Sequence, residues 1–213
     1  SPPWARPGAA PARHPMSSHP DHKIAVLVSG TGRHLENLCR LEAEGALGGT
    51  VSLCISSKPG VLALERAAAA SVPSAVLEKA GSEDDESYGS RIFEEIRRAE
   101  ADTVVLAGFL KKLWIPEDYR GRVINIHPSL LPAFGGKGFY GRRVHSAVLA
   151  RGCQVSGCTV HLVDEVYDNG PILVQRWCPV QPDDSADTLA ARVFDEELRA
   201  LPEGLARFWA KHS

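Results

Sequence analysis

Short apolar runs alternate with helix-like stretches along most of this chain. The apolar runs, rich in valine, isoleucine and leucine, predict strands at residues 23–29, 50–56, 74–77, 103–107 and 123–127. Between them, apolar residues recur at three- and four-residue spacing and predict helices at 35–44, 62–70 and 83–98. Strands that alternate with helices are typical of a parallel sheet covered by helices. This half of the chain therefore predicts a mononucleotide-binding α/β fold.

The pattern changes after residue 127. Residues 144–150 predict a short helix, and 155–163 and 172–180 alternate in the manner of antiparallel strands. A long terminal helix is predicted at 186–209, with Ser185 as its N-cap. No internal repeat or interior linker is visible. We expect one α/β domain over residues 23–213, with a mostly parallel twisted sheet flanked by helices and with antiparallel strands and a long helix toward the C-terminus.

Residues 1–22 have a different character. They are rich in proline and alanine and show neither helical nor strand periodicity, so we expect a disordered N-terminal extension. The extension contains arginine and no acidic residue before Asp21, which also fits the remnant of a targeting peptide. Met16 offers a third interpretation, a natural translation start. We expect a cytoplasmic protein, or a plastid protein if the extension is a targeting remnant.

Length and charge narrow the class of protein. A chain of 213 residues with 44% hydrophobic and 23% charged residues fits a single globular core. A formal net charge of −2 gives no broad basic field for nucleic acid, and no apolar run approaches the roughly 20 residues of a membrane helix. We expect small-molecule substrates, no nucleic-acid or membrane partner, and a monomer or weak homodimer.

The five cysteines do not predict a disulfide framework or a metal site. Their number is odd, most lie in apolar segments, and none has the spacing of a zinc ligand set. They are Cys39, Cys54, Cys153, Cys158 and Cys178. Cys153 and Cys158 could approach each other, but buried reduced thiols are the favoured interpretation.

Residues 125–132, Asn-Ile-His-Pro-Ser-Leu-Leu-Pro, place an amide and an imidazole where an apolar strand passes into a loop. Residues two apart on a strand point the same way, so Asn125 and His127 can act on one substrate atom. An amide N–H can hydrogen-bond a developing oxyanion, and a histidine can move a proton near neutral pH. Taken alone, the pair also fits a turn beside a surface histidine.

The whole octapeptide resembles the signature of the folate-dependent formyltransferases, in particular the phosphoribosylglycinamide formyltransferases. Further matches follow in the family's order at residues 28–32, 104–110, 157–161 and 168–172. The resemblance implies direct transfer of a formyl group from 10-formyltetrahydrofolate to the amine of N1-(5-phospho-D-ribosyl)glycinamide (GAR), the third step of de novo purine biosynthesis. It also implies a catalytic set of Asn125, His127 and Asp168, with no metal and no covalent enzyme intermediate.

Asp168 lies in a segment that Gly170 and Pro171 mark as a turn, where an aspartate alone would be ordinary turn chemistry. The resemblance instead implies a carboxylate that supports the positive charge of His127 and orients its ring. His161, on an alternating strand, matches a histidine near the active site. His145 matches a position at a helix opening. Both are expected to support the site at most.

Residues 29–34, Ser-Gly-Thr-Gly-Arg-His, follow the first strand and open the first helix, so their backbone N–H groups can hold a phosphate. A tight turn is the alternative for such a Gly-x-Gly. Leu35 replaces the third glycine of a dinucleotide fingerprint, which favours a single phosphate. The resemblance implies that Gly32, Arg33 and His34 grip the phosphate and that Glu197 binds the ribose and glycinamide portion. Arg33 and His34 replace the usual Ser-Asn of the family.

On the folate side, the resemblance assigns contacts to Leu110, Lys111, Lys112, Leu113 and Asn125, with the loop 163–168 closing over the pterin. Two segments depart from the family. Residues 83–86 are acidic where an arginine near the folate tail is common, which leaves polyglutamate preference open. The glycine-rich segment 134–141 is longer than in many relatives and is either a substrate-side lid or a surface insertion.

Alternative functions remain. Methionyl-tRNA formyltransferase and formyltetrahydrofolate deformylase share the Asn/His/Asp core but carry further domains, and both are disfavoured. A formyltransferase for another amine, a formyltetrahydrofolate hydrolase and a non-catalytic nucleotide- or folate-binding module stay open as alternatives. The Arg33-His34 departure fits a changed substrate or the non-catalytic module.

Overall fold

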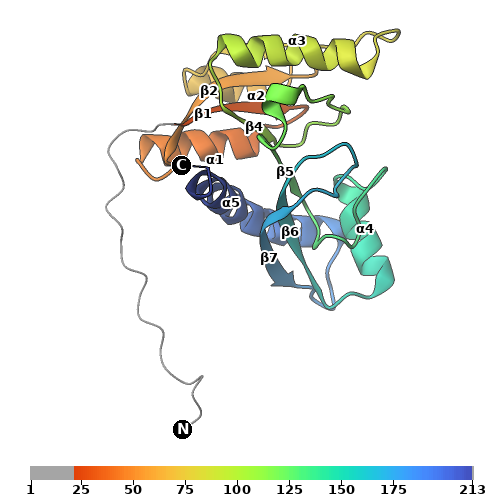
Figure 1. Cartoon of the computed structure of the whole chain (residues 1–213). Helices are drawn as coiled ribbons and strands as arrows, with labels where there is room; N and C mark the ends of the chain where they lie inside the picture. The colour runs from red at the N-terminus through yellow and green to blue at the C-terminus, as the bar shows by residue number, and fades with distance from the viewer. Residues whose placement is uncertain (1–21, 213) are drawn as a thin grey trace.

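The computed structural model of the chain describes residues 22–212, which form a seven-stranded sheet in the order β3-β2-β1-β4-β5-β6-β7 (Figure 1). The strands are β1 His22–Val28, β2 Gly49–Ser56, β3 Ser74–Val76, β4 Thr103–Leu106, β5 Val123–His127, β6 Val155–Leu162 and β7 Ile172–Pro179. β1 to β5 pair in parallel, and β6 and β7 add to β5 in antiparallel fashion. The predicted fold class is confirmed.

The helices also follow the prediction closely. They are α1 Arg33–Ala43, α2 Leu62–Ala69, α3 Asp85–Arg98, α4 Arg142–Arg151 and α5 Ala186–Ala210, with a 3-10 turn at Glu117–Tyr119 that sequence periodicity did not predict. Three residues are too few to show a period. α1 begins two residues earlier than predicted, so Arg33 and His34 belong to its first turn.

The predicted extension falls almost wholly on residues 1–21, which lie outside the described residues. His22, which we had placed in the extension, is the first residue of β1.

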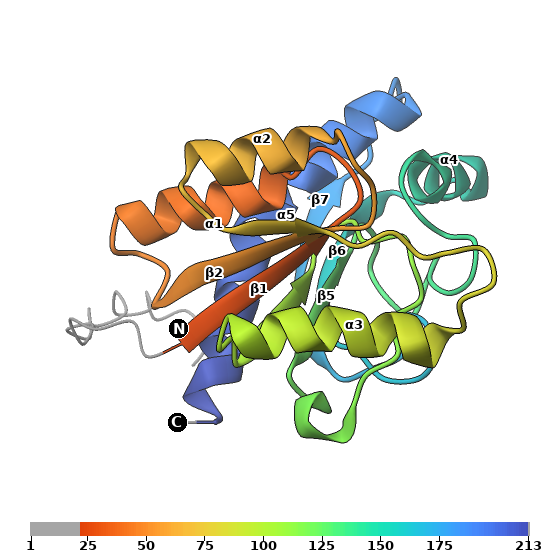
Figure 2. The same cartoon turned by 90° about the horizontal axis from the view of Figure 1, so that it is seen from above.

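Two hydrophobic cores lie on opposite faces of the sheet because consecutive strand residues point to opposite sides. In β1, Ile24, Val26 and Val28 pack with α1, α2 and α5, whereas Ala25 and Leu27 pack with α3. Figure 2 shows α1 and α2 on one face of β1 and β2 and α3 on the other. This two-sided burial explains the almost continuous apolar runs of the parallel strands.

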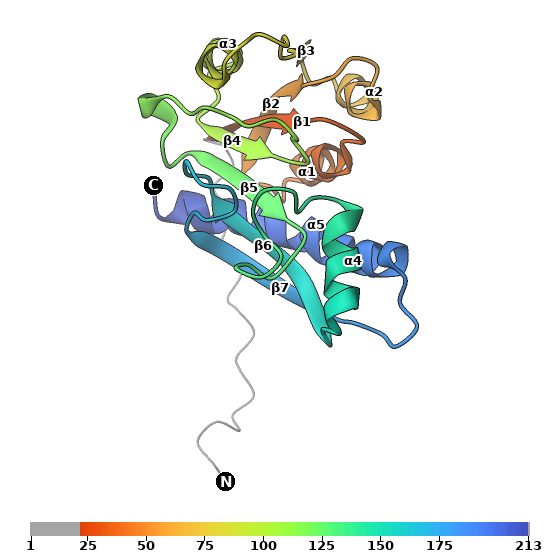
Figure 3. The same ribbon diagram turned by 90° about the vertical axis from the view of Figure 1, so that its right-hand side faces the viewer.

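α5 begins at Ala186 with Ser185 as its N-cap, as predicted. The Ser185 side chain accepts from the Thr188 N–H and the Thr188 hydroxyl accepts from the Ser185 N–H, which forms a capping box. The helix packs on β6 and β7 and against α4, an arrangement visible in Figure 3. It thereby places a carboxylate, Glu197, close to the start of α1.

The two ends of the described chain meet beside the amino-terminal ends of β1 and β4. The rings of His22 and Trp209 stack with centroids 4.8 Å apart. Trp209 Nε1 donates to Thr103 Oγ1 at 3.0 Å, and His22 Nδ1 lies 3.3 Å from the Asp102 carboxylate. The carboxyl ends of β1, β4 and β5 lie at the other end of the strands, where ligands bind in open α/β sheets.

No helix within residues 22–212 has the length and apolar character needed to span a bilayer. All five cysteines lie in this part of the chain and are free thiols, as predicted. Burial raises the pKa of Cys39 to about 11 and that of Cys54 and Cys158 to about 12. These thiols are protonated near neutral pH and are poor nucleophiles.

Candidate active site

The structure brings Asn125, His127 and Asp168 together at the carboxyl end of β5. Asn125 Nδ2 lies 3.4 Å from Asp168 Oδ1, and His127 Nδ1 lies 3.5 Å from Asp168 Oδ2. The two β5 side chains reach the same carboxylate because they are two residues apart on one strand. Asp168 lies in the loop between β6 and β7. β6 pairs with β5 in antiparallel fashion, and this pairing brings the loop close to the end of β5. The three side chains that we predicted to act together are therefore neighbours.

Two backbone groups of the glycine-rich segment hold this cluster. The Gly136 N–H donates to Asp168 Oδ2 at 2.9 Å, and His127 Nε2 donates to the Phe134 carbonyl at 2.8 Å. A Cβ at Gly135 would lie 3.3 Å from the Asp168 Cβ and 2.4 Å from Leu131 Cδ2, so the segment approaches Asp168 through a glycine. The glycine-rich segment is thus part of the site wall. Its backbone contacts had no sequence signal beyond the glycines.

The cluster is nearly covered by this segment. His127 is 4% exposed and His161 is 1% exposed, whereas Asn125 is only half-buried. Two surface cavities lie elsewhere, one lined by Leu130, Val155, Gln175 and Trp177 and one between α1 and α2. A ligand therefore reaches Asn125 most directly, and contact with His127 requires the Phe134 carbonyl to move aside.

The ring of His127 lies between two hydrogen-bond acceptors. A carbonyl oxygen can only accept, so Nε2 must carry hydrogen to bond Phe134. The other ring nitrogen, Nδ1, faces a carboxylate oxygen of Asp168.

His161 lies beside the Asn125 amide. Its Nδ1 lies 2.9 Å from the Leu162 carbonyl and must donate there. Its Nε2 faces both Asn125 Nδ2 at 3.2 Å and Asp168 Oδ1 at 3.6 Å. The Asn125 N–H that faces Asp168 makes a long 3.4 Å contact. This N–H is the one most easily released to another acceptor.

The carboxyl group of Asp168 is held ionised. Burial acts most strongly and alone would raise its pKa, but interactions with His161 and the Gly136 N–H, together with the charge of His127, outweigh burial and lower the pKa below its ordinary value. Asp168 also has φ of +53°, an uncommon backbone conformation for a residue other than glycine. Aspartate tolerates this conformation better than most residues, and such outliers cluster at functional sites.

The anion-binding turn, residues 29–32, follows β1 and leads into α1. Gly32 is the N-cap of α1 with φ of +72°, and a Cβ there would lie 2.6 Å from both Cα and Cβ of Ala63. Only glycine fits this close approach to α2. The first N–H groups of α1 have no intrahelical partners, so the turn can bind an anion.

The structure also joins residues predicted as separate substrate contacts. His34 Nε2 and Glu197 Oε2 lie 2.8 Å apart, with both side chains about 90% buried. The Arg33 guanidinium lies over the Phe194 ring, 3.8 Å from its centroid, and stays exposed. His34 and Glu197 therefore hold each other, and Arg33 is the cation that remains open to a ligand on this side.

His145 is a buried histidine whose ring is not fully hydrogen-bonded. It lies on α4, is 4% exposed, and its Nδ1 has no hydrogen-bond partner within residues 22–212. Burial is the main cause that lowers its pKa, the charge of Glu197 opposes this shift, and His127 adds to it. Sequence reasoning ranked it only as supporting.

His145 gives a testable pH dependence of stability. A pKa lowered in the folded protein means that the unfolded chain binds more protons below pH 6.5, so stability present above that pH is lost on acidification. We expect the free energy of unfolding of the wild type to fall more steeply between pH 7.5 and pH 5 than that of His145→Gln, as measured by urea unfolding. His212→Gln, at the exposed end of the chain, should keep the wild-type slope. Identical slopes for His145→Gln and the wild type would contradict this.

The folate-side segment predicted from the sequence is tied to the anion-binding turn. The Leu110 N–H donates to Ser29 Oγ at 3.0 Å, and Ser29 Oγ lies 2.6 Å from Ser57 Oγ. Leu110, Lys111 and Lys112 are exposed and Leu113 is half-buried, so these side chains are available to a ligand. Ser29 thus links the ends of β1 and β4, which carry the two predicted binding regions.

The acidic residues 83–86 are largely engaged within the protein. Glu83 pairs with Arg91, Asp84 caps α3 by accepting from the Ser87 N–H, and Asp85 pairs with Lys79 and Lys112.

Within residues 22–212 no three His, Cys, Asp or Glu side chains are grouped as metal ligands.

The chain is similar in sequence to known formyltransferases. A family model described as formyl transferase matches residues 22–205. The chain is 41% identical over 195 residues to the trifunctional purine biosynthetic protein adenosine-3 of Drosophila melanogaster, covering 90% of this chain and 14% of that protein. It is 41% identical over 177 residues to the chloroplastic phosphoribosylglycinamide formyltransferase of Vigna unguiculata, covering 82% of this chain and 57% of that one. The chain thus spans less than two thirds of these curated relatives.

Solved structures of similar size also resemble it. Glycinamide ribonucleotide transformylase 1 from Symbiobacterium toebii superposes with a TM-score of 0.83 at 34% identity, covering 90% of this chain and 88% of that one. Phosphoribosylglycinamide formyltransferase from Bacillus halodurans gives a TM-score of 0.80 at 30% identity, covering 90% and 97%.

Proposed function

Because the chain belongs to the formyl transferase family, we propose that it transfers the formyl group of 10-formyltetrahydrofolate to the primary amine of GAR. The observation that supports this most directly is the convergence of Asn125, His127 and Asp168 at the carboxyl end of β5. Such a set suits acyl transfer, which needs donors for an oxyanion and a carboxylate to manage protons. Curated relatives and solved structures that carry this activity in their names support the choice of substrates.

The anion-binding turn would take the phosphate of GAR. Backbone N–H groups at the start of α1 suit a phosphate, and the exposed Arg33 guanidinium adds a fixed positive charge beside them. Glu197, oriented by His34, would accept hydrogen bonds from the ribose or the glycinamide portion. Bound in this way, GAR would direct its amine end toward Asn125, His127 and Asp168.

The folate would approach along the segment 110–113 after β4. β4 pairs with β5, and Leu106 lies opposite Asn125, so a pterin held beyond the end of β4 brings its formyl group toward Asn125. The exposed Lys111 and Lys112 would face the negatively charged end of the cosubstrate. No metal takes part in this proposal.

In the proposed reaction, the neutral amine attacks the formyl carbon and the formyl oxygen becomes an oxyanion. An α-amino group has a pKa of about 8, so a useful fraction is already nucleophilic near neutral pH. The N–H of Asn125 that faces Asp168 would exchange this long contact for the formyl oxygen. Contacts of this kind are often long before substrate binds.

Protonated His127 would supply a further donor. Its Nε2–H is now bonded to the Phe134 carbonyl, and the adjoining Gly135 and Gly136 allow that carbonyl to move aside when substrate enters. Ionised Asp168 stabilises the imidazolium and would relay the proton of the attacking amine toward the folate nitrogen. After the new C–N bond has formed, collapse of the oxyanion breaks the bond from the formyl carbon to the protonated folate nitrogen, giving formyl-GAR and tetrahydrofolate.

The proposal is tested with purified protein and both substrates. We expect tetrahydrofolate to form from 10-formyltetrahydrofolate only when GAR is present, with one formyl-GAR produced for each tetrahydrofolate. Release of tetrahydrofolate with water alone would indicate a hydrolase, and binding of either substrate without turnover would indicate a binding module.

One observation supports a second candidate. Arg33 and His34 replace the usual Ser-Asn pair, and His34 is committed to Glu197. A different phosphorylated amine could fit this altered surface. An assay across phosphorylated primary amines, with GAR as the reference, distinguishes the two by the ratio of kcat/KM values.

A further inference from the structure

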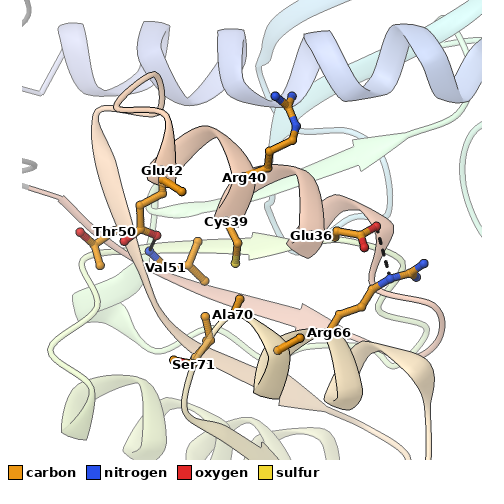
Figure 4. Close-up of a pocket in the computed structure, with 12 residues that line it drawn as sticks. Glu36, Cys39, Arg40, Glu42, Thr50, Val51, Arg66, Ala70 and Ser71 are labelled. Carbon is orange, nitrogen blue, oxygen red and sulfur yellow. Dashed lines mark hydrogen bonds and ion pairs between the residues drawn. The ribbon is translucent and has the colours of Figure 1, made fainter.

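Arg66 lies on α2, has been given no role above, and contacts the anion-binding turn. Its Nη1 donates to the Thr31 carbonyl, and its Nε lies 3.3 Å from Oε2 of Glu36 on α1. Figure 4 shows Arg66 reaching from α2 to Glu36 at one end of the groove between these helices. The Arg66 side chain is 23% exposed and its partner Glu36 is 60% exposed, so the contact lies at the protein surface. One side chain therefore joins α2, the turn and α1.

Two consecutive carbonyls of the turn are held by α2. The Gly30 carbonyl accepts from the Ala63 N–H at 3.2 Å, and the Thr31 carbonyl accepts from Arg66. In a trans peptide the C=O and N–H of one unit point in opposite directions. The N–H groups that share these peptide units belong to Thr31 and Gly32, so both are turned away from α2. An anion is bound when such N–H groups converge on one side of a turn.

We propose that Arg66 is a positioning residue for phosphate binding, which fixes the Thr31–Gly32 peptide so that its N–H faces the phosphate. This inference rests on the proposed function, because it concerns the same phosphate. Arg66 itself does not touch the ligand. Its role is to satisfy the carbonyl on the far side of the turn, so the peptide does not rotate when the ligand is absent.

Arg66 acts by orienting the Thr31–Gly32 peptide rather than by attracting the phosphate with its charge. The carboxylate of Glu36 at 3.3 Å compensates most of its positive charge, which weakens any long-range attraction to phosphate. The planar guanidinium can donate to the Thr31 carbonyl through Nη1 while its Nε stays paired with Glu36, whereas a lysine ammonium is a single point donor on a flexible stem. The geometry therefore favours arginine over lysine.

Substitution of Arg66 tests this directly. We expect Arg66→Gln to raise KM for GAR, and the dissociation constant for ribose 5-phosphate, by about 10-fold or more, with kcat and KM for 10-formyltetrahydrofolate nearly unchanged. Arg66→Lys should recover only part of the loss. Arg40→Gln removes the same charge from the same groove, where Arg40 pairs with Glu44, and should match the wild type. Full recovery by lysine would overturn the proposal.

Glu36→Gln provides a second test, because the two hypotheses predict opposite changes in phosphate affinity. If Arg66 acts through its charge, removal of the neighbouring carboxylate should tighten phosphate binding. If Arg66 acts by position, the loss of its charged partner should weaken phosphate binding, by about 3- to 10-fold. A lowered dissociation constant for ribose 5-phosphate in Glu36→Gln would overturn the positioning role even if Arg66→Gln does not fold.

Titration calorimetry with ribose 5-phosphate separates this inference from the proposed function. If GAR is not turned over but the wild type binds ribose 5-phosphate and Arg66→Gln binds it weakly, the proposed function fails and the positioning role stands. If GAR is turned over and Arg66→Gln binds ribose 5-phosphate as the wild type does, the positioning role fails alone. A wild type that binds no phosphate ester overturns the positioning role.

Discussion

Replacement of Asp168 by asparagine is expected to lower kcat for formyl transfer by about 10²- to 10⁴-fold. The carboxylate faces His127 Nδ1 and accepts from the Asn125 amide and the Gly136 N–H. An asparagine keeps the shape but presents an NH₂ group to one of these donors and cannot stabilise an imidazolium. Initial rates of tetrahydrofolate formation at saturating GAR and 10-formyltetrahydrofolate measure the effect.

The same substitution should leave the protein folded. The interactions that lower the pKa of the Asp168 carboxyl group outweigh burial, so the ionised group stabilises the folded protein at neutral pH and the amide loses that contribution. Asparagine keeps the shape and tolerates the positive φ of this position, so we expect a modestly lower melting temperature with a cooperative transition. Asp118→Asn removes a surface carboxylate that pairs with Arg97 and should keep full activity. An Asp168→Asn variant with wild-type kcat would exclude the carboxylate from the mechanism.

Gly32→Ala should have the second largest effect, on both stability and GAR binding. The added Cβ would lie 2.6 Å from the Ala63 backbone in a residue with φ of +72°. The left-handed conformation costs an alanine about 1–2 kcal/mol and overpacking adds about 1–3 kcal/mol. We expect a melting temperature about 5–15 °C lower, measured by calorimetry, and KM for GAR raised by about 10-fold or more.

Gly30→Ala is the matched control for the stability effect. A Cβ at Gly30 would meet no atom within 4 Å, and its backbone φ lies outside the left-handed region. Its melting temperature should stay within about 3 °C of the wild type. Equal melting temperatures for Gly30→Ala and Gly32→Ala would show that the turn relaxes away from α2.

Most of the fold could be predicted because each element has its own local pattern. β1 and β4 are buried on both faces, so their sequences are continuous apolar runs, and α5 carries a complete capping box at Ser185. The helix starts were less certain. α1 was predicted to begin at Leu35, because Arg33 and His34 carry no apolar signal although the backbone is already helical there.

The catalytic cluster could be predicted in part. Asn125 and His127 are two residues apart on one strand, so their common direction follows from strand geometry alone. The approach of Asp168 came from family resemblance, because no local rule brings a loop after β6 to the end of β5. The contributions of Phe134 and Gly136 come from backbone groups that every residue possesses. Only the folded chain identifies which of them face the site.

The hydrogen bond between His34 and Glu197 shows a different limit of prediction from sequence. Both residues were predicted as ligands of the substrate, and 163 positions separate them in the sequence. A single sequence carries no sign that two such polar residues pair with each other. Their pairing leaves Arg33, stacked on Phe194, as the more accessible cation of the two departures from the family pattern.

The stack of His22 on Trp209 has an architectural consequence. Both ends of the folded unit leave beside the amino-terminal ends of β1 and β4, while the reactive side chains lie at the other end of the strands. Polypeptide attached at either end would extend away from Asn125, His127 and Asp168. A unit built in this way can be joined to other modules within a longer protein without blocking its own chemistry.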